Sequence, residues 1–141
     1  KFFYKRMDFN FLEEDIYFIP LQNISKEKRM FYLTEILFYK NPRFIHYHYD
    51  MENNETSLLI SNDVITPEFL SFFNFNDIQF YNCIQITNTN EFLNESGFVK
   101  KISSIFSQKN IPILYITTLK SNFILFHNIH LSSIKNIFHE F

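Results

Sequence analysis

The sequence contains a single glycine, Gly97, and it has neither tryptophan nor alanine among its 141 residues. Phosphate-binding loops of the G-x-G-x-x-G and G-x-x-x-x-G-K-[ST] types need several glycines, so both are excluded. A disulfide framework and a CxxC zinc site are excluded as well, because Cys83 is the only cysteine. The sequence therefore predicts no cofactor.

The charge balance and the hydropathy pattern exclude two further classes. A formal net charge of -2 and a pI of about 6.2 leave no basic excess with which to displace counterions from a nucleic acid. No apolar run approaches the roughly 18 residues of a membrane helix, and charged residues interrupt the apolar residues at the start of the chain, unlike a secretory signal. We expect a cytoplasmic protein that binds neither nucleic acid nor membrane.

Aromatic residues are abundant, with 20 Phe and 8 Tyr. Hydrophobic residues make up 46% of the chain, which is enough to build a core. We expect some of the aromatic surplus to reach the surface, where an apolar patch usually means association. The composition therefore predicts a homodimer or a heteromeric protein partner.

The spacing of apolar residues predicts the same order of elements in each half of the chain. In the first half, a strand precedes a helix capped by Asn23 or Ser25, then a hairpin and a short helix. The strand is expected at 16–21, and the helix is expected to end at 40–42. The hairpin strands are expected at 44–49 and 57–61, and the short helix at 66–73. In the second half a strand is expected at 78–87 and a helix at 94–109. The hairpin strands are expected at 113–118 and 123–126 with their turn at 119–122, and the closing helix at 131–138.

The two halves share their helix ends. Asn41 and Asn110, 69 positions apart, each follow a lysine at the end of a predicted helix and precede a proline by one or two residues. Such a repeated order indicates duplication of a β-α-β-β-α unit of the ferredoxin-like type, with helices on one face of an antiparallel sheet. The predicted fold class is α+β, with a lead-in segment or extra strand at 1–14 and units at 15–75 and 76–141.

The second half also resembles a known family. Its stretches Ser96–Val99, Ile111–Leu119 and Lys120–Phe126 resemble ACT domains, and they are similar to the tandem ACT type of the CASTOR arginine sensors and of short bacterial ACT proteins. The resemblance covers about residues 95–138 and is weaker over 15–75. It implies a regulatory protein that is not an enzyme, in which an amino acid binds where two ACT units meet.

The resemblance also implies a set of ligand-lining residues at one turn, one strand and one hairpin. They are Glu95, Ser96, Gly97 and Phe98, then Ile111, Pro112 and Ile113, and then Ser121 and Asn122. The first residues of a helix offer unpaired N–H groups and a positive dipole end to a carboxylate, and a glycine there lets a ligand approach the backbone. The plain alternatives are a turn glycine at Gly97 and an asparagine at a hairpin tip for Asn122.

Three other functions remain as alternatives. Ser121-Asn122 replaces the family's Thr-Asp pair, and Pro112 replaces its serine, which favours a degenerate ACT scaffold that serves only in oligomer or complex assembly. An enzyme is disfavoured because no catalytic constellation can be placed. RNA-binding sheets share the element order, but this chain lacks their basic charge and their glycine-rich strand motifs.

His46 and His48 alternate on a predicted strand, so their rings lie on the same face. Two such histidines can ligate zinc, but a zinc site needs at least a third protein ligand. The sequence identifies none, so no metal site is predicted.

Overall fold

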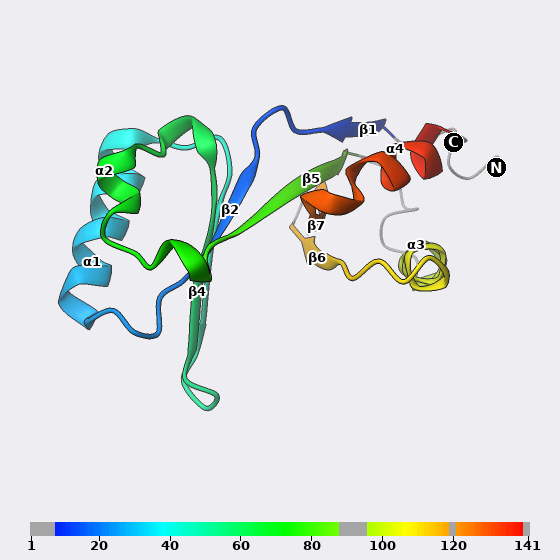
Figure 1. The fold of residues 1–141 in the computed structure, drawn as a ribbon. Coiled ribbons are helices and arrows are strands. Elements are labelled where there is room, and N and C mark those ends of the chain that lie inside the picture. The colour runs from blue at the N-terminus through cyan, green and yellow to red at the C-terminus, as the bar shows by residue number, and fades with distance from the viewer. Residues whose placement is uncertain (1–7, 88–95, 119–120, 140–141) are drawn as a thin grey trace. The chain divides into compact units, whose positions relative to one another are not determined.

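The computed structural model describes residues 8–87, 96–118 and 121–139 (Figure 1). The chain forms two compact units. One consists of residues 14–80, and the other consists of the described residues of 1–13 and 81–141. None of the helices in these described residues has both the length and the apolar character needed to cross a bilayer.

The unit of residues 14–80 has three strands, two helices and short helical turns. They are β2 (Ile16–Pro20), α1 (Lys26–Glu35) with a π-helical continuation (Ile36–Lys40), β3 (Ile45–Asp50), β4 (Glu55–Ser61), a 3-10 turn (Asn62–Val64), α2 (Pro67–Leu70) and a second 3-10 turn (Phe75–Asp77). The strand order is β3-β4-β2, and both pairings are antiparallel. Figure 1 shows α1 and α2 together on one side of these strands.

Local signals start the helices of this unit at the expected places. The Ser25 hydroxyl oxygen accepts a hydrogen bond from the Lys28 N–H, and the Thr66 hydroxyl oxygen accepts one from the Phe69 N–H. Each bond satisfies one of the N–H groups that the first turn of a helix leaves unpaired. Ser25, rather than Asn23, is therefore the cap of α1.

The end of α1 has a feature that the sequence did not predict. The Asn41 N–H donates to the carbonyl of Ile36, 3.0 Å away, which closes a π-helical turn, and Asn41 adopts φ 49°. Helical spacing predicts one apolar stripe through Met30, Leu33, Leu37 and Phe38, but Phe38 is 78% exposed. The buried residue is instead Ile36, the first residue of the π turn, and Met30 and Leu37 of that stripe are also more than half exposed.

The core of residues 14–80 joins alternate strand positions to the two helices. Ile19 of β2 and Leu58 and Ile60 of β4 pack with Ile36 and Phe69. Alternate strand residues point to the same face, so the helices cover one face of this part of the sheet.

The second unit has a strand from the start of the chain. Its elements are β1 (Asp8–Phe11), β5 (Gln79–Thr87), α3 (Ser96–Gln108), β6 (Leu114–Thr117), β7 (Ser121–His127), a 3-10 turn (Asn128–His130) and α4 (Leu131–His139). The strand order is β1-β5-β7-β6, and all pairings are antiparallel. The lead-in segment therefore supplies an edge strand, with Phe11 opposite Ile84.

The core of this unit follows the same rule of alternation. Ile84 and Ile86 of β5 and Ile124 of β7 pack with Ile102 of α3 and Ile134 of α4. Ile102 and Phe106 of α3 are buried, and α3 and α4 cover the same face of these strands.

The hairpin between β6 and β7 is tighter than the sequence suggested. The Thr118 N–H donates to the Ser121 carbonyl at 2.8 Å, and the Thr118 hydroxyl oxygen accepts from the Ser121 N–H at 3.1 Å. These bonds start β7 at Ser121, so the expected turn at 119–122 is corrected. Asn122 is not at a hairpin tip but inside a strand, opposite Ile86 and Thr117.

Candidate functional site

Five of the expected ligand residues lie at the end of the second unit's sheet or at the start of α3. Ser121 and Asn122 are paired with the last residues of β5, and α3 begins at Ser96 with Gly97 as its second residue. Gly97 has no positive φ. The structure describes only the backbone of Ser96 and Phe98, and Glu95 lies outside the described residues.

Asn122 carries the clearest chemical signal at this end of the sheet. Its side chain is buried, with only 3% exposed, and its Oδ1 atom has no hydrogen-bond partner within the ranges that the structure describes. Leaving a buried polar group unpaired costs about 1–3 kcal/mol. A donor from a bound molecule would remove that cost.

Tyr115 of β6 and Ser121 of β7 are polar residues on the strands around Asn122. The Tyr115 hydroxyl is also buried without a partner in the described part of the chain, and burial raises the pKa of Tyr115 to about 12. Tyr115 is opposite Ile124, so it shares the helix-covered face with Asn122. Ser121 points to the other face, where its hydroxyl oxygen accepts a hydrogen bond from Gln85 Nε2 at 3.2 Å.

The structure separates the remaining expected residues from this group. Ile111 follows the C-terminal end of α3, where its N–H donates to the Phe106 carbonyl and its side chain is buried in the core. Pro112 is exposed, and Ile113 is partly buried against the core. A helix of α3's length spans about 20 Å, so these three residues lie at its opposite end from Gly97.

A pocket of about 600 Å³ lies within residues 14–80, beside the connection from β2 to α1. Its lining residues come from the end of β2, the β2–α1 connection and the segment after α2. They are Ile19, Pro20, Gln22, Asn23, Ile24, Phe72, Phe73, Asn74, Asn76, Asp77, Ile78 and Gln79. Five side-chain amides and one carboxylate thus surround buried Ile19 and Ile78, which is a suitable lining for a small polar molecule.

This pocket lies at the same step in the element order as the start of α3 does in the other unit, namely where a first strand is followed by a first helix. Sequence analysis missed it because that passage carries no glycine. The available signal was the amide-rich pair of segments at 22–23 and 74–79.

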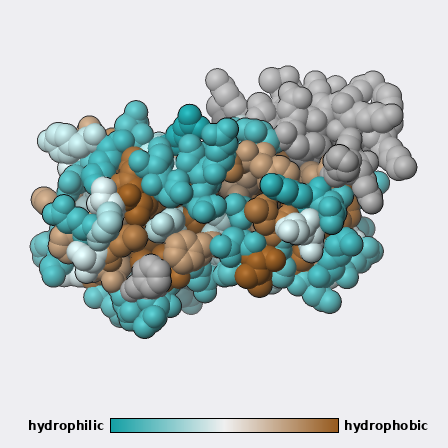
Figure 2. Space-filling model, turned by 45° about the horizontal axis from the view of Figure 1, so that its top comes forward, coloured by the Kyte–Doolittle hydropathy of each residue, from teal (hydrophilic) through white to brown (hydrophobic). Residues whose placement is uncertain are grey.

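The first helix of residues 14–80 presents an apolar surface. Met30, Phe31, Phe38 and Tyr39 are all more than half exposed, and a hollow of about 560 Å³ lies between Met30, Phe31, Thr34, Glu35 and Tyr39. On the side drawn in Figure 2, hydrophobic surface likewise appears as patches between hydrophilic residues.

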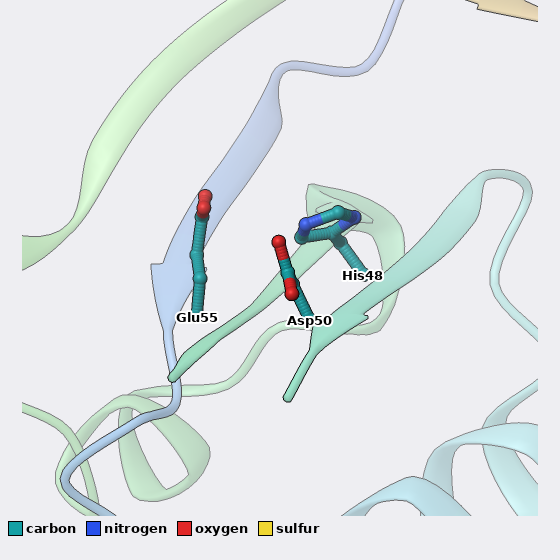
Figure 3. A group of neighbouring side chains, drawn as sticks. All are labelled: His48, Asp50 and Glu55. Carbon is teal, nitrogen blue, oxygen red and sulfur yellow. The ribbon is translucent and has the colours of Figure 1, made fainter. Parts of the chain in front are cut away.

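A third group gathers at the β3–β4 hairpin. His48, Asp50 and Glu55 extend in the same direction beside its turn (Figure 3). The side-chain amide of Asn53, followed by backbone N–H groups, lowers the pKa of Asp50. Burial, and then the charge of His48, lowers the pKa of the neighbouring His46.

Comparison with known proteins finds likeness in structure alone. No known protein family and no curated protein matches the sequence. Protein Atu0741 from Agrobacterium tumefaciens superimposes with a TM-score of 0.63 at 14% identity, over 96% of this chain and 88% of the other.

Two aspartate kinase structures are also similar. A C-terminal regulatory domain of aspartate kinase from Porphyromonas gingivalis matches with a TM-score of 0.54 at 14% identity, over 90% of each chain. The chain has an ACT-type fold. The allosteric aspartate kinase of Clostridium acetobutylicum matches this ACT-type chain with the same TM-score at 15% identity, over 90% of this chain and 32% of the kinase.

Proposed function

We propose that this ACT-type chain is a cytoplasmic, non-catalytic regulatory protein that binds a small polar ligand of the amino-acid class. The observation that carries the proposal is the pocket beside the β2–α1 connection. It occurs on a fold shared with a regulatory domain of aspartate kinase.

We further propose that the two units are tandem ferredoxin-like ACT units. In each unit the strands follow the same order, β3-β4-β2 in one and β6-β7-β5 in the other, with the third strand of each unit in the middle. Each first helix is followed by an asparagine with positive φ, Asn41 or Asn110. This agreement favours the tandem arrangement of the CASTOR type.

The chemistry of the pocket fits an amino acid. Asp77 supplies the only charged side chain of the lining, and it would attract an α-amino group. The amides of Gln22, Asn23 and Asn74 can donate to a carboxylate, while Ile19 and Ile78 form an apolar floor. The volume of about 600 Å³ lies within the usual range of small-molecule sites.

A second location for such a ligand is the turn before α3. Because Gly97 has no positive φ, a left-handed backbone is not the reason for this glycine, and its lack of a side chain would let a ligand approach the backbone. The unpaired oxygen of Asn122 supports the same proposal. Glu95, Ser96 and Phe98 are proposed to line this location, whereas Ser121 points to the other face of the sheet and Ile111–Ile113 lie beyond the far end of α3.

The test is a thermal-shift screen of the wild-type chain against the free amino acids. A ligand at 100 times its Kd adds about 2.7 kcal/mol to the free energy of unfolding, which gives a clear rise in Tm. We expect Asp77→Asn to abolish the rise and the matched surface change Glu27→Gln to leave it intact. A panel in which no amino acid raises Tm would refute the proposal.

The second candidate function is assembly without a small ligand, and the exposed apolar face of α1 favours it. We propose that a second copy of the chain covers this face. If two α1 helices pack antiparallel about Phe31, the hollow between Met30 and Tyr39 of one copy receives an aromatic ring of the other. Such a symmetric pairing covers the apolar faces of both copies at once, which supports a homodimer.

A further inference from the structure

We infer that His48, Asp50 and Glu55 form a binding site for a divalent transition-metal ion beside the turn of the β3–β4 hairpin. The site is separate from the proposed ligand pocket, since none of its residues lines that pocket.

The strand pairing brings the three side chains together. His48 and Asp50 are two residues apart on β3, so both point to the same face. Glu55 is directly opposite Asp50 in the β3–β4 register, which places it on that face too. One ligand atom from each residue lies within 4.8 Å of the other two (Figure 3).

The turn holds Asp50 in place. Its Oδ1 atom accepts hydrogen bonds from the N–H groups of Glu52 at 3.1 Å and Asn53 at 3.3 Å, and its Oδ2 atom accepts one from Asn53 Nδ2 at 2.7 Å. Asn54 takes the positive φ of 50° that the turn requires. Oδ2 accepts only one hydrogen bond and so keeps a lone pair for a metal, and the orientation of the carboxylate is fixed in advance by these partners.

The charge of the cluster supplies an independent reason for a cation. Asp50 and Glu55 are like charges directly opposite on paired strands, an arrangement that destabilises a hairpin. Within residues 8–87, 96–118 and 121–139 the ion pair found is between Arg43 and Glu14, so neither of these carboxylates is neutralised by a lysine or arginine. A bound dication would turn this repulsion into attraction.

The donor set selects the class of metal. One imidazole nitrogen with two carboxylate oxygens suits Zn²⁺, Mn²⁺ or Co²⁺, whereas Mg²⁺ and Ca²⁺ prefer oxygen ligands alone. Zinc bonds of about 2.0–2.2 Å bring neighbouring donors to about 3 Å from one another. His48 and Glu55 are exposed, so rotation of their side chains closes the present spacing. Three protein ligands leave at least one position for water.

The test is calorimetric titration of the whole chain with ZnCl₂ in the absence of other ligands. We expect one ion per chain, and binding at least tenfold weaker in His48→Gln and in Glu55→Gln. The matched controls Glu52→Gln, in the same turn, and His130→Gln, in the other unit, should bind as the wild type does. A tenfold excess of Mg²⁺ should leave zinc binding unchanged.

A second readout does not depend on variants that fold well. Sub-stoichiometric Mn²⁺ added to the wild-type protein should broaden the proton resonances of His48 and of the 50–55 turn first. Unchanged affinity in His48→Gln, equal displacement of zinc by Mg²⁺, or broadening centred on another histidine would each overturn the proposed site.

Discussion

Asn41 and Asn110 show how single residues fix the ends of long helices in this chain. Their φ angles are 49° and 56°, in the left-handed region that costs most L-residues roughly 1–2 kcal/mol. Asparagine tolerates this region better than other residues with a β-carbon, because its short side chain can hydrogen-bond locally.

The first prediction follows from that geometry. Asn110→Val should lower the free energy of unfolding by about 1–2 kcal/mol, because a β-branched side chain clashes in the left-handed region. Asn110→Gly should be neutral or slightly stabilising at the same position. Urea denaturation measures both, and equal stability of the valine and glycine variants would contradict the observed φ angle.

A second residue-scale prediction concerns pH. Burial raises the pKa of the Cys83 thiol from 9.0 to about 12, so above pH 9 the unfolded chain loses this proton while the folded chain keeps it. The stability that Cys83 contributes is therefore complete below pH 9 and falls by up to about 1.4 kcal/mol per pH unit between about pH 9 and 12.

Urea unfolding at pH 8, 9 and 10 tests this dependence. Cys83→Ala has no thiol to ionise, so its stability should fall less steeply over this range than that of the wild type. Parallel pH profiles of the two proteins would show that Cys83 ionises equally in both states.

Features of single residues could be predicted from the sequence where they depend only on residues nearby in the chain. The helix ends at Asn41 and Asn110 could be predicted, because cap geometry depends on neighbouring residues alone. The burial of Asn122 could not, because it depends on how Thr118 and Ser121 close the hairpin. Asp50 and Glu55 were also missed as partners of His48 in the proposed metal site, because Glu55 lies beside Asp50 only through the pairing of β3 with β4.

At the scale of elements, α1 stands apart from the other long helices. It has no buried residue, whereas α3 buries Ile102 and Phe106. The π turn at Ile36–Lys40 moves the apolar residues that follow α1 to the surface. The π turn could not be predicted from helical spacing, because the spacing assumes 3.6 residues per turn throughout.

At the scale of elements, we predict that the exposed apolar face of α1 mediates self-association. Phe31→Glu should convert a dimer into a monomer at micromolar concentration, because it places two carboxylates where the two α1 helices would cross. Analytical ultracentrifugation measures the mass, and circular dichroism checks that the variant is folded. Ile129→Glu is the matched control, since Ile129 is also an exposed apolar residue but lies in the other unit.

Two results would count against the homodimer. One is a wild-type chain that sediments as a monomer, and the other is a wild-type dimer that Phe31→Glu leaves intact. In the first case the face would serve a different protein, and in the second the dimer would form elsewhere.

At the scale of the whole molecule, each unit buries its own core and repeats the same order of strands and helices. The order of elements could be read from the sequence because hydrophobic periodicity and helix caps recur in both halves. The ACT-type resemblance over 95–138 agrees with the structural likeness to the aspartate kinase regulatory domain. The position of the pocket could not be read, because it depends on segments 19–24 and 72–79 meeting in space.

The central claim is that this ACT-type chain binds a free amino acid in the pocket beside α1. The most direct measurement is a titration of the ¹⁵N-labelled chain, followed by amide chemical shifts, with each amino acid that raises Tm. The account predicts saturable shifts concentrated in Gln22–Ile24 and Asn74–Gln79, which Asp77→Asn removes. Saturable shifts confined to other segments, or no shifts with any amino acid, would contradict it.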